Sequence, residues 1–226
     1  AWRFNWQKSS PVDFDERIMR LYFSTAARES EAPGVIAVTS SVEGEGVYSP
    51  SLALARLGAA VGNKRVVFVD LTDDYESDDG ASPTEPQKSL AALVRKNGSL
   101  ETVIQSDESF DVLRVGEFKD GTAGSSSVSN FAQLIKKLQQ EYDLVIFCVP
   151  PVLNSSQVPF ILSEADALVY AVRWNKTRST TVQHALASLL DFGIVPSGVV
   201  LTDVDEARIH QVHQGHRSMR LSGGLS

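Results

Sequence analysis

A glycine-containing loop holds the residues whose types and spacing could do chemistry. From Thr39 to Pro50 it reads TSSVEGEGVYSP, and it lies between an apolar run and a helical pattern. Backbone N–H groups in such a loop, together with the N-terminus of the following helix, attract anions. The pattern therefore predicts a phosphate-binding loop centred on Gly44, Glu45 and Gly46.

The two positions after Gly46 lack the side chains that phosphate chemistry uses. A working loop places a lysine there to reach the β- and γ-phosphates, and then a Ser or Thr to hold Mg²⁺. Val47 and Tyr48 stand at these positions. An ordinary strand-to-helix turn capped by Ser49 accounts for the segment at least as well as phosphate binding, so both interpretations stay open at this point.

Alternating apolar runs and helical patterns predict the elements that would position this loop. Because β-branched runs separated by helices are typical of a sheet covered on both faces, we expect an α/β fold: a doubly wound, mostly parallel sheet flanked by helices. The predicted strands are 35–38, 66–69, 112–115, 144–147, 167–171 and 198–201, and the predicted helices are 51–61, 88–96, 130–141 and 181–192. Segments 73–86 and 119–129 predict exposed loops.

Length and composition favour one soluble domain. The 226 residues, 42% of them hydrophobic, are enough for one sizeable core. A net charge of −7 with dispersed basic residues argues against a nucleic-acid partner. We expect an N-terminal segment with a helix over 1–33, the α/β domain over 34–206 and a polar C-terminal tail over 207–226. The chain starts with alanine, so two alternatives stay open: a free-standing protein, or an excised piece of a longer protein with membrane segments.

Cysteine and histidine offer no strong site. Cys148, the only cysteine, follows a buried strand and is expected to be an inert core residue in a reducing compartment. His210, His213 and His216 are spaced by three but lack a supporting carboxylate pattern, so we expect a solvated tail and no metal site.

Several longer segments match the motifs of a known family. The loop roughly follows the family's motif T-S-S-x-P-G-E-G-K-S-T, and Asp70 matches the first aspartate of its D-x-D-L motif. Residues 142–152, YDLVIFCVPPV, resemble the family's motif Y-D-x-V-I-I-D-T-P-P-V. Residues 98–105, 165–178 and 198–205 match further segments. The chain thus resembles the cytoplasmic domain of bacterial tyrosine kinases (BY-kinases), the Wzc-, CapB- and ExoP-like proteins of capsule and exopolysaccharide export, within the MinD/ParA-like deviant Walker group. The resemblance covers nearly the whole chain and implies a P-loop NTPase-like fold.

The resemblance also implies a nucleotide site, and this sequence departs from it at most positions. Cys148 replaces the Walker B aspartate, Thr72 replaces the second aspartate after Asp70, and Thr202 replaces an asparagine that contributes to adenine recognition. Asp70, without its partners, would simply cap the following turn. We therefore expect no catalytic residue and only a vestigial nucleotide-binding set, which comprises Gly44, Glu45, Gly46, Val47, Tyr48, Ser49, Asp70, Cys148 and Thr202.

Two other family features are reduced. The oligomer-forming E-x-x-R-x-x-R pattern survives only as Glu16, with Met19 and Tyr22 at the arginine positions. The C-terminal tyrosine cluster that these kinases phosphorylate has no counterpart, because no tyrosine follows Tyr170. Concerted loss of interdependent parts is strong evidence against a working kinase.

These observations lead us to expect a non-catalytic, pseudokinase-like domain in bacterial exopolysaccharide or capsule biosynthesis and export. Its expected partner is a membrane polysaccharide co-polymerase, or this protein's own membrane part. We expect the domain to lie at the cytoplasmic side of the inner membrane, and a homo-oligomer is a further option. No cofactor is expected, and ATP or ADP with Mg²⁺ would bind only if residual binding persists. The alternatives are a weak nucleotide-binding regulator and a MinD/ParA-like positioning factor, which the P-P-V and K-T-R segments disfavour.

Overall fold

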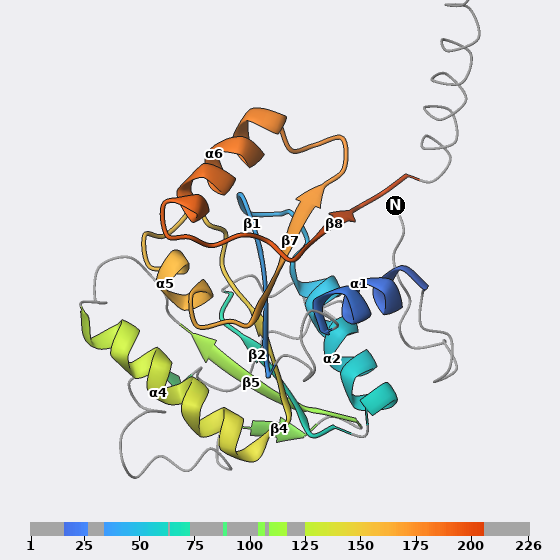
Figure 1. Ribbon diagram of the computed structural model, residues 1–226, viewed down its shortest axis with the longest axis vertical. Helices are drawn as coiled ribbons and strands as arrows, with labels where there is room; N and C mark the ends of the chain where they lie inside the picture. The colour runs from blue at the N-terminus through green and yellow to red at the C-terminus, as the bar shows by residue number, and fades with distance from the viewer. Residues whose placement is uncertain are drawn as a thin grey trace, which may run out of the picture.

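One sheet with helices on both faces forms the molecule (Figure 1). The structure is a computed structural model, and it describes residues 16–26, 34–62, 64–72, 88–89, 104–106, 109–116 and 125–205. The strands are β1 Val35–Ser40, β2 Val66–Asp70, β3 Lys88–Ser89, β4 Ile104–Ser106, β5 Asp111–Gly116, β6 Leu144–Cys148, β7 Ala167–Arg173 and β8 Gly198–Thr202. The helices are α1 Glu16–Ala26, α2 Tyr48–Gly62, α4 Ser125–Glu141, α5 Val158–Leu162 and α6 Ser179–Leu190.

The sheet is mostly parallel, which confirms the predicted fold class. Its strand order is β3-β5-β2-β6-β1-β7-β8, and β4 adds to β5 as the antiparallel member. In the centre, Val38 of β1 pairs with Cys148 of β6 on one side and Val169 of β7 on the other. Because the strands run in one direction, the loops that follow them meet at one edge of the sheet, where ligands of such folds bind.

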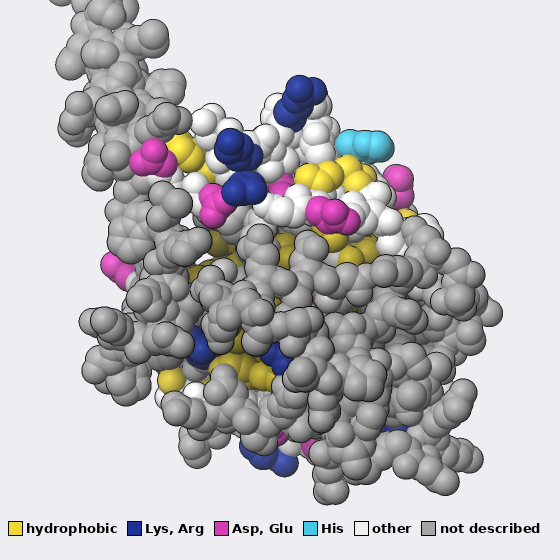
Figure 2. All heavy atoms as spheres, turned by 180° about the vertical axis from the view of Figure 1, so that it is seen from behind, with side chains coloured by type: hydrophobic (Ala, Val, Ile, Leu, Met, Phe, Trp, Pro, Cys, Tyr) yellow, Lys and Arg dark blue, Asp and Glu magenta, His cyan; other side chains and the backbone are white. Residues whose placement is uncertain are grey.

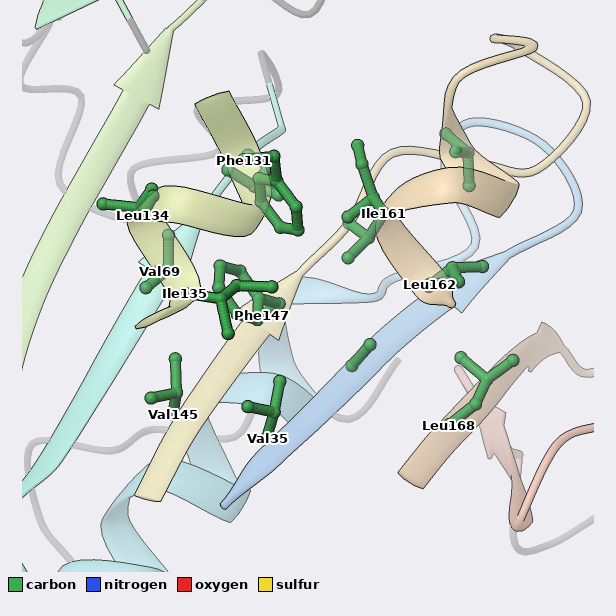
Figure 3. Packing of buried hydrophobic residues seen from close by; sticks show 14 of the residues in the cluster. Val35, Val69, Phe131, Leu134, Ile135, Val145, Phe147, Ile161, Leu162 and Leu168 are labelled. Carbon is green, nitrogen blue, oxygen red and sulfur yellow. The ribbon is translucent and has the colours of Figure 1, made fainter. Parts of the chain in front are cut away.

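Each face of the sheet has its own apolar core. The α4-side cluster lies under α4, α5 and α6 and includes Val69, Phe131, Leu134, Ile135, Val145, Phe147, Ile161, Leu168, Tyr170 and Leu189 (Figure 3). The α2-side cluster lies under α1 and α2 and includes Tyr22, Ile36, Val38, Leu54, Leu57, Phe68, Ile146, Cys148 and Val169. This alternation along each strand follows from side chains that point to opposite faces.

Helix α2 lies unusually close to the sheet. A Cβ atom at Gly58 would be 2.4 Å from Cδ2 of Leu144 on β6, so only glycine fits this contact without a shift. The close packing fixes the position of the helix that begins directly after the glycine-containing loop.

The structure corrects two sequence predictions. Helix α4 begins at Ser125 instead of residue 130, so the predicted loop 119–129 is helical in its second half. The serines there suggest a loop by composition, but serine is also favoured at helix N-termini. Lys88 and Ser89, predicted as helical, form β3 beside β5, whereas the rest of the predicted helix 88–96 lies outside the described residues.

Other predictions fall outside the described residues, including the loop 73–86 and His210, His213 and His216. Within the described ranges, none of the helices combines the length and apolar character that spanning a membrane requires.

Candidate functional site

The glycine-containing loop joins β1 to α2 and keeps the backbone shape that its glycines allow. Gly44 has φ 73° and Gly46 has φ 71°, in the left-handed region that side chains disfavour. The start of the loop is tied to the segment after β6, because Val152 N–H donates to the Ser40 carbonyl at 2.8 Å. Asn154 from the same segment donates to the Glu43 carboxylate at 2.6 Å.

Glu45 lies inside the loop and holds it. Its side chain is buried, at 2% exposure, and its carboxylate accepts the backbone N–H groups of Ser41 at 2.6 Å and Val42 at 3.0 Å. Its other oxygen accepts a hydrogen bond from the Thr177 hydroxyl. A buried carboxylate with three donors is well satisfied, so Glu45 works as an internal brace of the loop.

Sequence reasoning placed Glu45 among nucleotide-binding residues and assigned no role to Thr177. The only sequence signal for their contact was that each belongs to a segment matching the same family, the loop motif and the K-T-R motif. The structure joins these two segments directly.

Residues at the ends of β7 and β8 tie the outer side of the loop. The Thr202 hydroxyl donates to the Glu45 carbonyl at 2.6 Å, and Arg173 Nη1 donates to the Gly44 carbonyl at 3.1 Å. Arg173 Nη2 also pairs with the Asp203 carboxylate at 2.5 Å. The hydroxyl at the position expected to contribute to base recognition is therefore bonded to the loop itself.

The residues after Gly46 turn toward the protein core. Val47 and Tyr48 are partly buried against the α2-side cluster, and the Tyr48 ring meets the Phe68 ring edge to face, with centroids 5.4 Å apart. Helix α2 begins at Tyr48, so Ser49 is exposed within its first turn and does not precede the helix as the predicted cap. The positions of the lysine and the metal-binding hydroxyl thus hold packing side chains.

Asp70 ends β2 at the same edge of the sheet. It is buried, and its Oδ1 accepts both the backbone N–H of Thr72 at 2.9 Å and the Thr72 hydroxyl at 2.7 Å. It thus caps the turn after β2, as an Asx turn does. In the sheet register Asp70 lies between Arg114 of β5 and Cys148 of β6, and sequence reasoning had not selected Arg114.

Cys148 is fully buried in the α2-side cluster, as expected of a core residue. Its carbonyl accepts the Leu71 N–H at 2.9 Å, so the backbone at the Walker B position holds the end of β2. Glu16 lies on α1, where it pairs with exposed Arg20 at 2.6 Å. Met19 and Tyr22, at the family's arginine positions, pack into the α2-side cluster.

A buried tyrosine lies beneath the loop. The Tyr170 hydroxyl is hydrogen-bonded to the Ser41 hydroxyl at 2.8 Å. Burial raises the pKa of Tyr170, the hydrogen bond to Ser41 acts in the opposite direction, and the nearby Glu45 carboxylate adds to the increase. Tyr170 is therefore neutral over the physiological range and serves as a hydrogen-bonding support.

The site offers backbone N–H groups and a helix N-terminus, but no lysine follows the loop. Within the described ranges, no group of three or more His, Cys, Asp or Glu side chains could hold a metal ion. What the arrangement retains is the frame of a phosphate-binding loop.

A loop of this shape between the first strand of a parallel sheet and a helix defines a class, the P-loop NTPase-like α/β fold. In agreement, the structure resembles a chain of the MinC:MinD cell division protein complex of Aquifex aeolicus, with TM-score 0.62 and 14% identity over 78% of this chain and 72% of that chain. No family model matches the sequence.

Two further comparisons show higher sequence identity than the MinC:MinD complex does. The chimerical protein CapA2B2 superimposes with TM-score 0.70 and 23% identity, covering 86% of each chain. In sequence, tyrosine-protein kinase YwqD of Bacillus subtilis is 26% identical over 175 residues, 76% of this chain and 73% of the relative. The protein therefore has the kinase-domain fold of the bacterial tyrosine kinases, as the sequence motifs predicted.

The share of each relative that is covered differs widely. Tyrosine-protein kinase ptk of Acinetobacter johnsonii is 26% identical over 152 residues, which make up 66% of this chain but only 20% of that protein. This chain thus corresponds to one part of the longer relative.

Proposed function

We propose that this chain is a non-catalytic, pseudokinase-like domain of bacterial exopolysaccharide or capsule assembly. The observation that carries the proposal is the packing of Val47 and Tyr48 against the α2-side cluster, with the Tyr48 ring on Phe68. These two positions would have to supply the phosphate-binding charge and the metal-binding hydroxyl of a working kinase.

Phosphoryl transfer depends almost entirely on positioning and charge neutralisation by lysine, Mg²⁺ and carboxylates. Val47 supplies no charge, and Tyr48 is engaged in core packing. The Walker B position holds Cys148, which is fully buried and has no carboxylate. Asp70 is the remaining acid, and its Oδ1 is already engaged by Thr72. Loss of all these parts together supports a binding role over a catalytic one.

The proposed biological setting comes from the resemblance of the sequence motifs to the bacterial tyrosine kinases of capsule and exopolysaccharide export, and the names of the relatives agree with the kinase part of that resemblance. They are tyrosine-protein kinases, and the Acinetobacter relative is several times longer than the matched region. We take the domain to bind a membrane polysaccharide co-polymerase, or to be joined to one, on the cytoplasmic side of the inner membrane. Its role there would be that of a scaffold.

The test is calorimetry with Mg-ATP and an ATPase and autophosphorylation assay on the full chain. We expect neither low-micromolar binding nor turnover above a blank without protein, because Val47 supplies no charge at the position of the family's lysine. The Asp70→Ala variant serves as the control. Turnover that disappears in this variant would assign catalysis to the chain and refute the proposal.

A second candidate function is weak nucleotide binding without catalysis. The retained loop geometry favours it, since Gly44 and Gly46 keep positive φ angles beside the N-terminus of α2. This function predicts millimolar, Mg²⁺-independent binding of ATP in saturation-transfer NMR. Gly44→Val, which disfavours the left-handed backbone, should abolish the signal, whereas a signal that persists in Gly44→Val would place the nucleotide elsewhere.

A further inference from the structure

Strand β8 lies at one end of the sheet. It pairs with β7 on its inner edge, and among the described residues no strand pairs with its outer edge. Its side chains Val199 and Leu201 share one face and are 60% and 51% exposed, although both are large and apolar. Figure 2 shows apolar side chains at the surface of the upper part of the molecule, where β8 lies in Figure 1. Exposed apolar surface on an edge strand is a candidate for a contact site.

The backbone groups on the outer edge of β8 belong to the same two residues. The Thr202 carbonyl accepts the N–H of the first residue after β7 at 3.0 Å, so Thr202 turns its backbone groups toward β7. Backbone groups of successive residues in a strand point to alternate edges, and therefore Gly198 and Val200 also face β7. Val199 and Leu201 lie between these residues and direct their N–H and C=O groups to the outer edge.

Strand β8 lacks the side chains that protect an edge strand from other chains. Such strands commonly carry lysine or proline, whereas β8 reads GVVLT. Pro196 lies before the strand, and Asp203, with φ 51°, follows it directly. The Asp203 carboxylate is paired with Arg173 of the same chain. These features limit the length of the strand, but they place no charge on its outer edge.

The sequence of β8 suits pairing with the same strand of a second copy. In an antiparallel register centred on Val200, Val199 would lie opposite Leu201 of the second copy, and the reverse pair follows by symmetry. Both residues of each pair direct their backbone groups to the outer edge, so they can exchange both N–H···O bonds. Each pair also joins apolar side chains on one face. Asp203 would lie opposite Ser197, so no like charges meet.

We propose that two copies of this chain associate through the outer edges of β8, antiparallel and about a two-fold axis at Val200, so that their sheets join into one. A second copy is the occupant because the strand matches itself in hydrogen bonding, apolar pairing and charge. A standard interface buries about 800 Å² per partner, and a five-residue strand supplies less, so the dimer is weak. This contact is separate from the family's oligomer-forming pattern, of which only Glu16 remains.

Cysteine cross-linking in the full chain tests the geometry. At the two-fold axis, Val200→Cys would face its own copy with about 4.5 Å between the Cα atoms, which a disulfide can span. Val199→Cys is the matched control, because it would face its own copy only diagonally, at roughly 7–8 Å. Native Cys148 is fully buried.

We expect Val200→Cys to form an intermolecular disulfide about tenfold faster than Val199→Cys at equal protein concentration. Random collisions would give the opposite order, since Val199 is exposed and Val200 is partly buried against the α2-side cluster. Equal rates, or a faster reaction of Val199→Cys, would therefore refute the proposed pairing.

Sedimentation equilibrium measures the association itself. The average mass of the parent should rise above 24.6 kDa as the concentration increases. Val199→Lys should weaken the dimer at least about tenfold, because symmetry places the lysine opposite Leu201 at both ends of the contact. Val195→Lys is the matched control, since Val195 is 63% exposed but lies outside the strand, and it should leave the association unchanged. A monomer at every concentration, or a dimer that Val199→Lys does not weaken, would overturn the proposal.

Discussion

The two sides of the glycine-containing loop are built in opposite ways. Toward β7 and β8, polar groups brace it: Thr177 bonds to the Glu45 side chain, Thr202 to the Glu45 carbonyl and Arg173 to the Gly44 carbonyl. Toward α2 and β2, Val47 and Tyr48 pack as apolar side chains against the core. The comparison teaches that the shape of a phosphate-binding loop and its chemistry are separable. The polar side holds the shape of the loop, and the apolar side presents packing side chains where the family motif has a lysine and a hydroxyl residue.

The largest expected effect comes from restoring family residues on the apolar side. The triple variant Val47→Lys, Tyr48→Ser and Cys148→Asp would remove the ring packed on Phe68 and place a charge at a fully buried position. We expect the free energy of unfolding to fall by roughly 5 kcal/mol in urea titrations, without gain of ATP turnover. Turnover fails because Thr72 and Thr202 remain and catalytic groups that act as a unit are not additive.

Val47→Lys alone is the control for the triple variant, because its side chain starts from a partly buried position and should cost less. If the triple variant hydrolyses ATP and its melting temperature is not below that of the parent, the loop can still support catalysis once the family residues are restored, which would contradict this prediction.

The next effect concerns the brace on the polar side. Glu45→Ala leaves the N–H groups of Ser41 and Val42 without their carboxylate acceptor, and we expect it to lower the free energy of unfolding by about 3 kcal/mol. Glu45→Gln is the matched variant, since it retains the size and one acceptor oxygen and should lose less. Equal stability of Glu45→Ala and the parent in urea denaturation would mean that the loop needs no brace.

Arg173 should contribute less, because its ion pair with Asp203 is partly exposed, at 40% and 55% of the two side chains. We expect Arg173→Ala to cost at most about 1 kcal/mol while speeding hydrogen exchange in the loop. Arg173→Lys keeps the charge, but a lysine cannot bond the Gly44 carbonyl and the Asp203 carboxylate with two separate nitrogen atoms as the guanidinium does. It should therefore restore the stability only in part. Full restoration by lysine would assign the effect to charge alone.

The smallest effect at neutral pH is expected beneath the loop. The pKa of Tyr170 is higher in the folded protein than in the unfolded chain, where it is near 10. The stabilisation that the neutral Tyr170 hydroxyl provides is therefore complete below about pH 10, and it is lost as the pH rises toward the pKa of the folded state. Tyr170→Phe should therefore flatten the loss of stability above about pH 10, at a cost of about 0.5 kcal/mol at pH 7 for the bond to Ser41. Unfolding curves at pH 7 and pH 10.5 test this, and an unchanged alkaline slope would contradict it.

Much of the fold could be predicted because buried strands leave a strong local signal. The β-branched runs at β1, β2, β6 and β7 are fully or largely buried, so their composition carries their role. Strands β3 and β4 have two and three residues, too few for a recognisable period. The start of α4 was missed because serines fit both loops and helix starts.

At the site, the sequence indicated where the loop lies but not how it is held. Glu45 and Thr177 are 132 residues apart, and Thr202 is 157 residues from Glu45. Contacts over such separations depend on the tertiary arrangement of β1, β7 and β8, which no local pattern encodes. The buried position of Cys148, by contrast, followed from its place at the end of an apolar strand.

The absent side chain at Gly58 has a genetic consequence. Because α2 rests so closely on Leu144, a residue with a side chain at this position forces the Leu144 side chain or the helix to shift, and a bulky residue is expected to displace the helix. The N-terminus of that helix carries Tyr48, so the displacement would reach the loop at the helix's other end. A random mutational screen for loop defects should therefore recover substitutions at Gly58. From such a screen alone, Gly58 would be mistaken for a residue of the site.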